Sequence, residues 1–223
     1  MGFLTHIYVE GDGDVKFISD YISHIKPDTK TDIVKEKNRI TAKVWFNNTL
    51  IATIHGLSGW TDIENMKTVI TKYKEMGNDV LAIFDADTND NEGGFAKRKK
   101  QIENFAFLLD DIFLFPNNQD DGSLEDLLEN IINKTNKPIF DCWDEYETCL
   151  QKCASERIGK KLTTPAKKSK IYGYLEALLG ESNREKEKIK DPNRDYKNSV
   201  HWNLDADYLI PLKNFLEKFI IKS

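Results

Sequence analysis

Two aspartates separated by one residue, Asp85 and Asp87, follow the apolar run DVLAIF at 79–84. A nearly continuous apolar run of this length is typical of a strand buried on both faces of a parallel sheet. Because side chains alternate along an extended backbone, the two carboxylates should project to one side, with Cα atoms roughly 7 Å apart. Such carboxylates repel each other unless a cation lies between them, and hard oxygen ligands suit Mg²⁺ or Mn²⁺. The pair therefore predicts a divalent metal site; turn-forming or helix-capping aspartates are the alternative.

Two more acidic clusters follow predicted strands. Glu10 lies in VEGDGD, at the end of a predicted strand at 4–11, and Glu125 lies in GSLED, after a predicted strand at 111–115. An open α/β sheet binds its ligands just beyond the carboxyl ends of its strands, so Glu10 can reach the same ion. The alternative for Glu10 is a chance succession of strand, glutamate and glycine. Three further acids are additional candidates: Asp14, Asp90 and Asp126.

The pattern of elements predicts an α/β fold. Strand and helix patterns alternate four times within residues 1–135, which is typical of βαβ units and a mainly parallel sheet flanked by helices. The segment 28–48 is ambiguous and is interpreted as a hairpin around Asn47–Asn48. The predicted strands are 4–11, 50–56, 79–84 and 111–115, and the predicted helices begin near 14, 62, 95 and 123.

Residues 136–223 are expected to form a helical C-terminal extension that packs on or beside the domain formed by 1–135. It contains a basic, Pro-broken stretch, expected to be an exposed arm, then a helix at 171–179. The amphipathic last element should dock on the sheet. Three cysteines spaced by seven and four residues would share one face of a helix, and they are expected to pack in the core as small hydrophobes rather than bind metal: Cys142, Cys149 and Cys153.

Charge is distributed unevenly over the 223 residues, whose net charge is −5. Residues 85–129 hold twelve acidic and four basic side chains, whereas residues 156–200 hold twelve basic and seven acidic ones. An acidic centre beside a basic flank suits a metal site next to a surface that binds a polyanion, and a solvated helical surface is the alternative. The side chains expected to bind a nucleic-acid backbone are Lys97, Arg98, Lys99, Lys100, Lys160, Lys161, Lys167, Lys168 and Lys170.

Several classes of protein are not expected. No apolar stretch approaches the roughly 20 residues that span a bilayer, and the first residues, MGFLTHIYVEGDGD, are not typical of a secretory signal, so we expect a cytoplasmic protein that does not bind membranes. The GDG at 11–13 lacks the third glycine of a dinucleotide fingerprint, because Lys16 occupies that position. The four histidines are scattered along the sequence and are expected to be structural.

The ordered acidic clusters resemble the TOPRIM domain, a metal-binding fold shared by topoisomerases, bacterial primases, recombination proteins and OLD-type nucleases. The resemblance is strongest to small stand-alone, OLD-nuclease-like TOPRIM proteins. It covers residues 1–135 well and the C-terminal end loosely. The segments that carry it are VEGDGD, HGLSGW, IFDAD, FPNN and GSLEDLL, with His201-Trp202 and PLKNFL near the end.

The resemblance implies roles for individual residues. Glu10 matches the TOPRIM glutamate, a metal ligand or general acid/base, and Asp85 and Asp87 match the two DxD metal ligands. Asp14 matches the acid that opens the first helix, and Glu125 matches the acid of the G-x-LE segment. The sequence lacks the fused ATPase of full-length OLD nucleases, so a separate ATPase partner is implied as an option.

The leading hypothesis is a Mg²⁺- or Mn²⁺-dependent nuclease that cleaves phosphodiester bonds in DNA or RNA. Glu10, Asp85 and Asp87 would bind the metal, and Glu10 or Glu125 would accept the proton of the attacking water. The alternative is a non-catalytic or regulatory TOPRIM module that acts in a complex with an ATPase. A third interpretation is an enzyme that uses the same ions on a nucleotide or oligophosphate. A homodimer is compatible with each of these.

Overall fold

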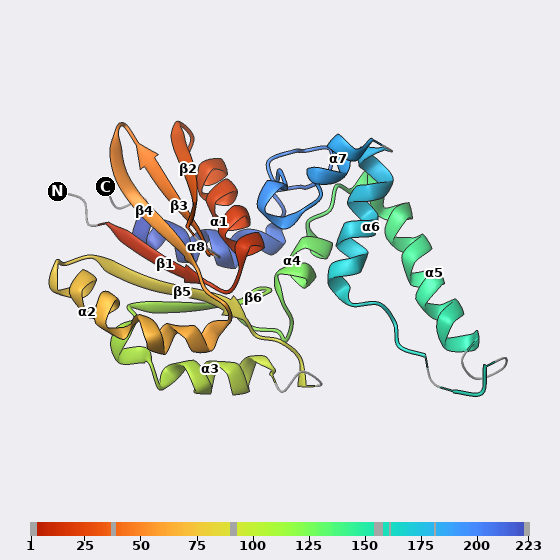
Figure 1. Ribbon diagram of the computed structural model, residues 1–223, viewed down its shortest axis with the longest axis horizontal. Coiled ribbons are helices and arrows are strands. Elements are labelled where there is room, and N and C mark those ends of the chain that lie inside the picture. Colours follow the sequence, from red (N-terminus) through yellow and green to blue (C-terminus); the bar gives the residue numbers. More distant parts are fainter. Residues whose placement is uncertain are drawn as a thin grey trace.

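The computed structural model describes residues 4–36, 39–89, 93–153, 158–160, 162–180 and 182–220. In these ranges the chain forms a mixed α/β fold with one six-stranded sheet, in the order β2-β3-β4-β1-β5-β6 (Figure 1). Strands β4, β1, β5 and β6 are mutually parallel, and β2 and β3 extend the sheet as an antiparallel edge. The strands are β1 (Thr5–Val9), β2 (Thr29–Glu36), β3 (Arg39–Phe46), β4 (Thr49–Gly56), β5 (Asp79–Asp85) and β6 (Asp111–Phe115).

The four predicted parallel strands are confirmed, and the ambiguous segment is resolved. Its hairpin is formed by β3 and β4, and the turn consists of Asn47 and Asn48, whose φ angles are 48° and 61°. Two central residues with positive φ are what a two-residue hairpin turn that matches the strand twist requires, and asparagine tolerates this conformation better than most residues. The Asn-Asn pair therefore fixes the pairing of β3 with β4 next to the turn, up to the register shift between Val44 and Trp45.

Helices cover both faces of the sheet. On one face, α1 (Asp12–Ile25) and α8 (Ile210–Ile220) pack on apolar side chains such as Ile7 and Phe113. On the other face, α2 (Lys67–Glu75) and α3 (Phe95–Glu103) cover Tyr8 and Phe84. Figure 1 shows these two layers, with the remaining helices beyond the ends of the strands. Those helices are α4 (Leu124–Asn130), α5 (Lys137–Cys153), α6 (Lys167–Leu179) and α7 (Asn183–Glu187).

The described parts of residues 136–223 contain helices, as predicted, and the last helix docks on the sheet. In α8, the Phe215 ring lies 5.4 Å from the Phe113 ring of β6, and the backbone carbonyl before the helix, at Leu209, accepts a hydrogen bond from Tyr21 of α1. One cluster of buried side chains runs from Ile7 to Ile220. Within the described ranges, no helix has both the length and the apolar character needed to cross a membrane.

Two expectations for the C-terminal extension are wrong. The three cysteines do share α5, but Cys142 and Cys149 are exposed and Cys153 is half-buried, because α5 lies outside the sheet and buries only its Phe140 side. The end of the basic stretch is not an exposed arm, because α6 begins at Lys167, four residues earlier than predicted. Lysines in a first helical turn oppose the helix dipole, so the nearby acids that pair with them stabilise this helix end.

A pair of histidines lies in the layer between the sheet and α2. His6 of β1 and His55 of β4 are on adjacent strands, and their Nδ1 and Nε2 atoms are 3.1 Å apart. The His6 ring stacks on the Tyr73 ring with 3.6 Å between the ring centroids, and the His55 ring stacks on the Tyr8 ring with 4.8 Å between the centroids. Burial lowers the pKa of His6 to about 4 and that of His55 to about 3. Both imidazoles are therefore neutral, structural groups at neutral pH.

We predict that this pair makes the protein sensitive to mild acid. The unfolded chain takes up a proton at each histidine near pH 6.5, whereas the folded chain does so only near pH 4 or below, so stability is lost as pH falls from 6.5. His55→Phe keeps an aromatic ring and should reduce the loss of unfolding free energy between pH 6.5 and 5 by up to about 2 kcal/mol. Urea unfolding at the two pH values measures this. His24→Asn is the control, because it removes a partly exposed imidazole of α1 that pairs with Asp205. An unchanged loss of unfolding free energy between the two pH values in His55→Phe would contradict the assignment.

Candidate functional site

Three carboxylates meet where β1 and β5 end and α4 begins. Glu10 follows β1, and its Oε1 accepts the backbone N–H of Asp85 at 3.0 Å. Asp85 is the last residue of β5, and its Oδ1 accepts the backbone N–H of Leu124, the first residue of α4, at 2.9 Å. Glu125 lies in the same first turn of α4. These hydrogen bonds connect the acids of all three predicted clusters through one short chain of contacts.

The strand order explains why the acids converge. From β1 the chain proceeds to β4 on one side of the sheet and then crosses to β5 on the other side of β1. Loops at the carboxyl ends of the strands diverge at such a switch point and leave a crevice there, which is where open α/β sheets bind ligands. Glu10 and Asp85 flank this crevice. The expectation that the acids lie beyond the carboxyl ends of parallel strands is therefore confirmed for these two residues.

Asp14 joins the group from the first turn of α1. Its pKa is raised to about 8, mainly by burial and in addition by the charges of Glu10 and Glu125. Burial also raises the pKa of Glu10 to about 7, against the effect of the Asp85 N–H, which stabilises the charged form. The pKa of Asp85 is raised well above its usual range by burial and by the charges of Asp14 and Glu10. Several negative charges in one partly buried space thus disfavour each other's ionisation.

These acids line a cavity of about 200 Å³ whose opposite wall comes from the C-terminal extension. Lys168 of α6 and the segment around Asp191, Arg194 and Tyr196 form that wall. The segment packs on α1: the Tyr196 backbone N–H donates to Asp20 at 3.1 Å, and a Cβ at Gly13 would lie 3.5 Å from the Asp191 Cβ. One side of the cavity is therefore acidic, and the opposite side carries the cationic side chains of Lys168 and Arg194. Its lining residues are Glu10, Gly11, Asp12, Gly13, Asp14, Asp85, Leu124, Glu125, Lys168, Asp191, Arg194 and Tyr196.

Asp191 organises this wall. It forms ion pairs with Lys168 and, at 3.0 Å, with Arg194, and it accepts the Tyr172 hydroxyl at 3.2 Å. Arg194 is buried and also donates to the Tyr196 hydroxyl, so it fixes the segment in place. Asp191, Arg194 and Tyr196 were not expected from the sequence. DPNRDY lies in a charged segment that resembles a solvated loop, and only the fold shows that it faces the acids.

Asp87 does not lie where the DxD spacing predicts. The strand ends at Asp85, and Asp87 has φ 58°, so its side chain does not repeat the direction of Asp85. Its backbone forms an isolated bridge to Gly122, and its carboxylate forms an ion pair with Arg98. Asp87 does not line the cavity, although its charge still raises the pKa of Glu10. The expectation that both carboxylates project to one side of an extended strand is wrong for this reason.

Glycine and serine set the geometry where α4 begins. Gly122 has φ 142°, and a Cβ there would lie 2.6 Å from the Asp126 carboxylate. That carboxylate accepts the backbone N–H of Ser123 at 2.8 Å, and the Ser123 hydroxyl donates to Glu125 at 2.9 Å. Asp126 therefore acts as a helix cap, and it also forms an ion pair with Lys167.

The predicted nucleic-acid-binding residues that the structure describes fall into three groups. Lys97, Lys99, Lys100 and Lys160 are exposed, and Lys167 and Lys168 are exposed with acidic partners at the start of α6. Arg98 and Lys170 differ from the prediction, because both are buried. Arg98 pairs with Asp87 and lies 4.7 Å from the Trp60 ring, and Lys170 pairs with Glu129 and Asp144. Lys161 and Asp90 lie outside the described residues.

The chemistry of the acids fits a hard divalent cation. Six carboxylates line the cavity, five near the strand ends and Asp191 on the opposite wall, and the repulsion among the five is relieved either by protons or by a cation. As the side chains stand, no group of three or more His, Cys, Asp or Glu in the described ranges is arranged to hold a metal ion. Glu10 and Asp85 each use one oxygen for a backbone N–H. Metal binding at this site would therefore require these side chains to reorient.

Comparison with known proteins identifies one family. A family model described as a protein of unknown function, DUF3226, matches residues 5–221. No curated protein and no solved structure gives a significant match. The match spans the sheet, the acidic cavity and the C-terminal extension alike.

We predict that Asp14 destabilises the protein at alkaline pH in metal-free buffer. Its pKa is about 8 in the folded chain and near 3.8 in the unfolded chain, so its contribution to stability is present below pH 4 and is lost as pH rises through 8. Asp14→Asn cannot ionise and should be more stable than the wild type at pH 8.5 by at least about 1 kcal/mol. Urea unfolding with a chelator at pH 6 and 8.5 measures the difference.

Asp32→Asn, on the exposed edge strand β2, is the matched control and should follow the wild-type pH dependence. If Asp14→Asn also follows it, Asp14 is not under electrostatic strain in the folded protein.

Proposed function

Because the chain belongs to the DUF3226 family, whose description names no activity, we propose a function from the chemistry of its site: metal-dependent cleavage of phosphodiester bonds. The observation that carries this proposal is the cavity in which five carboxylates lie opposite Lys168 and Arg194. Acids that bind a divalent cation, with basic side chains across a narrow space, match the charges of a metal-bound phosphate group. The TOPRIM-like identity of the fold, implied by the order of the acidic motifs, is part of the same proposal.

We assign a role to each acid from its position in the site and its burial. Asp85, Asp14 and Glu10 are the proposed metal ligands, because they share the cavity and their ionised forms need a compensating charge. A divalent cation bound there would polarise the phosphate and lower the pKa of a coordinated water. Asp87 is proposed to act on the charge of Glu10 from outside the cavity, where Arg98 holds it.

Glu10 is also the proposed proton acceptor. In the metal-free cavity its pKa is about 7, and a bound cation would lower that pKa, so that Glu10 would be ionised and able to accept a proton from the attacking water. Glu125 is the second candidate, from the first turn of α4, where its carboxylate is positioned by the Ser123 hydroxyl. On the opposite wall, Lys168 would neutralise a phosphate oxygen, while Arg194 uses its donors to hold Asp191 and Tyr196.

A nucleic acid is the proposed substrate, with a small oligophosphate as the second candidate. The exposed Lys97, Lys99 and Lys100 of α3 supply a basic surface for a polymer backbone. The volume of about 200 Å³ favours the small ligand, because it accommodates little more than one phosphate group with its immediate surroundings. A separate ATPase partner and a regulatory role in a complex with it remain predictions of the TOPRIM resemblance.

The metal site is tested by calorimetry. Titration with Mg²⁺ or Mn²⁺ should show binding that Asp85→Asn abolishes, because an amide keeps the Leu124 hydrogen bond but loses the charge. Since the acids of the cavity are partly protonated at pH 7, binding should release protons, and the measured heat should differ between buffers of different ionisation enthalpy. Asp32→Asn is the control with a carboxylate removed elsewhere. Wild-type metal affinity in Asp85→Asn would rule out the proposed site.

Cleavage assays test the reaction and its substrate. With Mn²⁺ or Mg²⁺, the wild type should cleave DNA, RNA or a small phosphodiester, and Glu10→Gln should be slower by a factor on the order of 10² or more. For a polymer, the joint substitution of Lys97, Lys99 and Lys100 by Ser should flatten the salt dependence of binding by up to about 0.9 log units per lost contact.

The same triple variant should leave cleavage of a small phosphodiester unchanged, which separates the two substrate classes. An inactive wild type that still binds Mn²⁺ would favour the regulatory alternative over the enzyme.

A further inference from the structure

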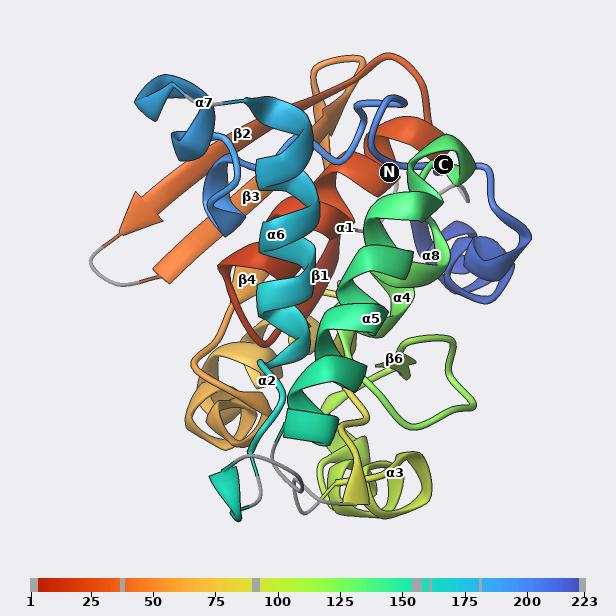
Figure 2. The same cartoon turned by 90° about the vertical axis from the view of Figure 1, so that its right-hand side faces the viewer.

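Helix α5 is the outermost element of the C-terminal extension and is only partly covered by it. Its 17 residues bury one side chain, Phe140, which lies against Tyr174 of α6 with ring centroids 5.0 Å apart. Figures 1 and 2 show α5 and α6 side by side at the end of the molecule that is farthest from β2 and the chain termini. Most of the surface of α5 therefore faces away from the rest of the chain.

The uncovered side of α5 carries an apolar seam. Ile139, Cys142, Tyr146, Cys149 and Cys153 succeed one another at spacings of three, four, three and four residues. This is the repeat of a helix that pairs with another helix through knobs-into-holes packing, with Ile139, Tyr146 and Cys153 at the first position of successive heptads. A seam of five such residues inside a single chain is normally buried.

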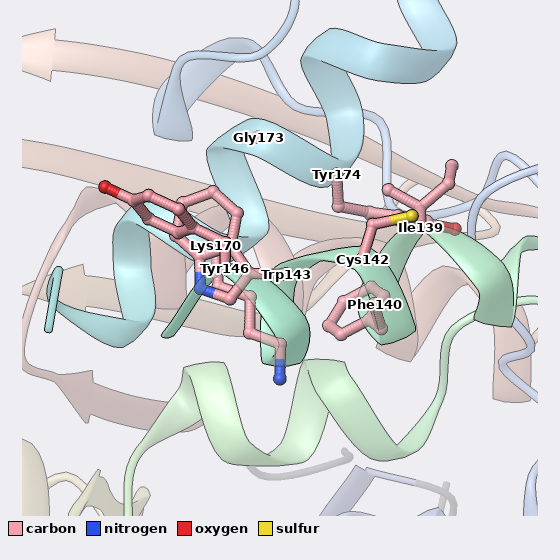
Figure 3. A pocket seen from close by; sticks show the side chains of 8 residues that line it. All are labelled: Ile139, Phe140, Cys142, Trp143, Tyr146, Lys170, Gly173 and Tyr174. Carbon is pink, nitrogen blue, oxygen red and sulfur yellow. The ribbon is translucent and has the colours of Figure 1, made fainter. Parts of the chain in front are cut away.

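In this protein the seam is open. Cys142 and Cys149 are exposed, Tyr146 is 46% exposed and Cys153 is half-buried, whereas Ile139 at the start of the seam is half-buried against the core of its own chain. Figure 3 shows how the seam meets α6: Cys142 and Tyr146 border an apolar groove of about 390 Å³. Trp143 closes the groove toward α6, where a Cβ at Gly173 would lie 2.7 Å from the indole ring.

The charges beside the seam allow two identical copies of α5 to pair opposite charges across their contact. Glu145 and Lys152 are one heptad apart on the same flank of α5, and both occupy the seventh heptad position. When two identical helices pair antiparallel, residues at the seventh position of one helix face residues at the seventh position of the other. Three registers, each displaced from the next by one heptad, bring seam residues of one copy into contact with seam residues of the other. Glu145 opposes Glu145 in one and Lys152 opposes Lys152 in another. Only the middle register places Glu145 of each copy opposite Lys152 of the other.

We propose that α5 is a self-association surface, on which α5 of a second copy of this chain packs antiparallel in this middle register. Such a contact is isologous, so each opposite-charge pair and each seam contact occurs twice. Cys142 then lies opposite Cys153 of the second copy, and Tyr146 lies opposite Cys149 of the second copy. In this register the two helices overlap over residues 142–153, about 18 Å, and a contact this short forms and dissociates with concentration.

Charge reversals on full-length protein test the proposal. In sedimentation over a concentration series, the wild type should shift from 25.8 kDa toward twice that mass. Glu145→Lys or Lys152→Glu alone brings like charges together twice and should weaken the dimer about tenfold. The double variant Glu145→Lys/Lys152→Glu should dimerise like the wild type. An equimolar mixture of the two single variants should also recover the dimer, because one copy then carries two lysines and the other two glutamates.

Asp141→Lys, on the other side of Glu145 from the seam, is the matched control and should leave the dimer intact. Circular dichroism verifies that each surface variant is folded. A monomeric wild type at the highest concentration would overturn the proposal, and so would a mixture that stays monomeric or single variants that dimerise like the wild type.

Cysteine cross-linking tests the register independently. In Cys149→Ser, a bis-maleimide of about 8 Å should join Cys142 to Cys153 between copies. Within one chain these residues are eleven positions apart, about 16 Å along the helix. Peptide mapping of the cross-linked dimer should show this mixed pair. Cross-links only between identical cysteines would indicate parallel pairing and would overturn the proposed register.

Discussion

Electrostatic repulsion among the carboxylates of Glu10, Asp14 and Asp85 is the main physical constraint on the site, and the contacts around the site offset it. Parallel strands end together, so the acids that follow β1 and β5 share one space, and α1 adds a third from its first turn. Burial raises the pKa of each, and their charges raise it further. Backbone N–H groups of Asp85 and Leu124 offset part of that cost by binding carboxylate oxygens. An arrangement that lowers stability but is held by specific hydrogen bonds is typical of a functional site rather than of a core.

The C-terminal extension places basic side chains near the acidic cavity, and other acidic side chains form ion pairs with them. Lys167, Lys168 and Lys170 lie in the first turn of α6, an unfavourable place for positive charge. Asp126 of α4 and Asp191 pair with the first two, while Glu129 and Asp144 pair with Lys170. The start of α6 is thereby tied to α4, whose own N-terminus binds Asp85. Asp85 of the cavity and the first turn of α6 therefore both contact α4.

The sequence reveals the sheet more completely than the site. Buried strands such as 79–84 are evident from continuous apolar runs, and the acids after them follow from the rule that parallel strands end together. The spacing of Asp85 and Asp87 was misleading, because an alternating direction requires that the strand continue, and here a residue with positive φ ends it. Asp191 and Arg194 could not be found, because their role depends on a long-range contact between α1 and residues 189–196 that no local pattern encodes. Among the basic residues, composition could not distinguish exposed Lys97 from buried Arg98.

The cysteine-bearing face of α5 shows the same limit in another form. The spacing placed the three cysteines on one helix face, and the assumption that an apolar face belongs to the core of its own chain was wrong. A periodic pattern states that a face needs a partner; it does not state which chain supplies it. In this protein α6 takes one side of α5, through Phe140 and Trp143, and the seam beside it stays open. Because α6 also carries Lys168 to the acidic cavity, a partner on that seam would restrain the same helix that forms the cavity wall.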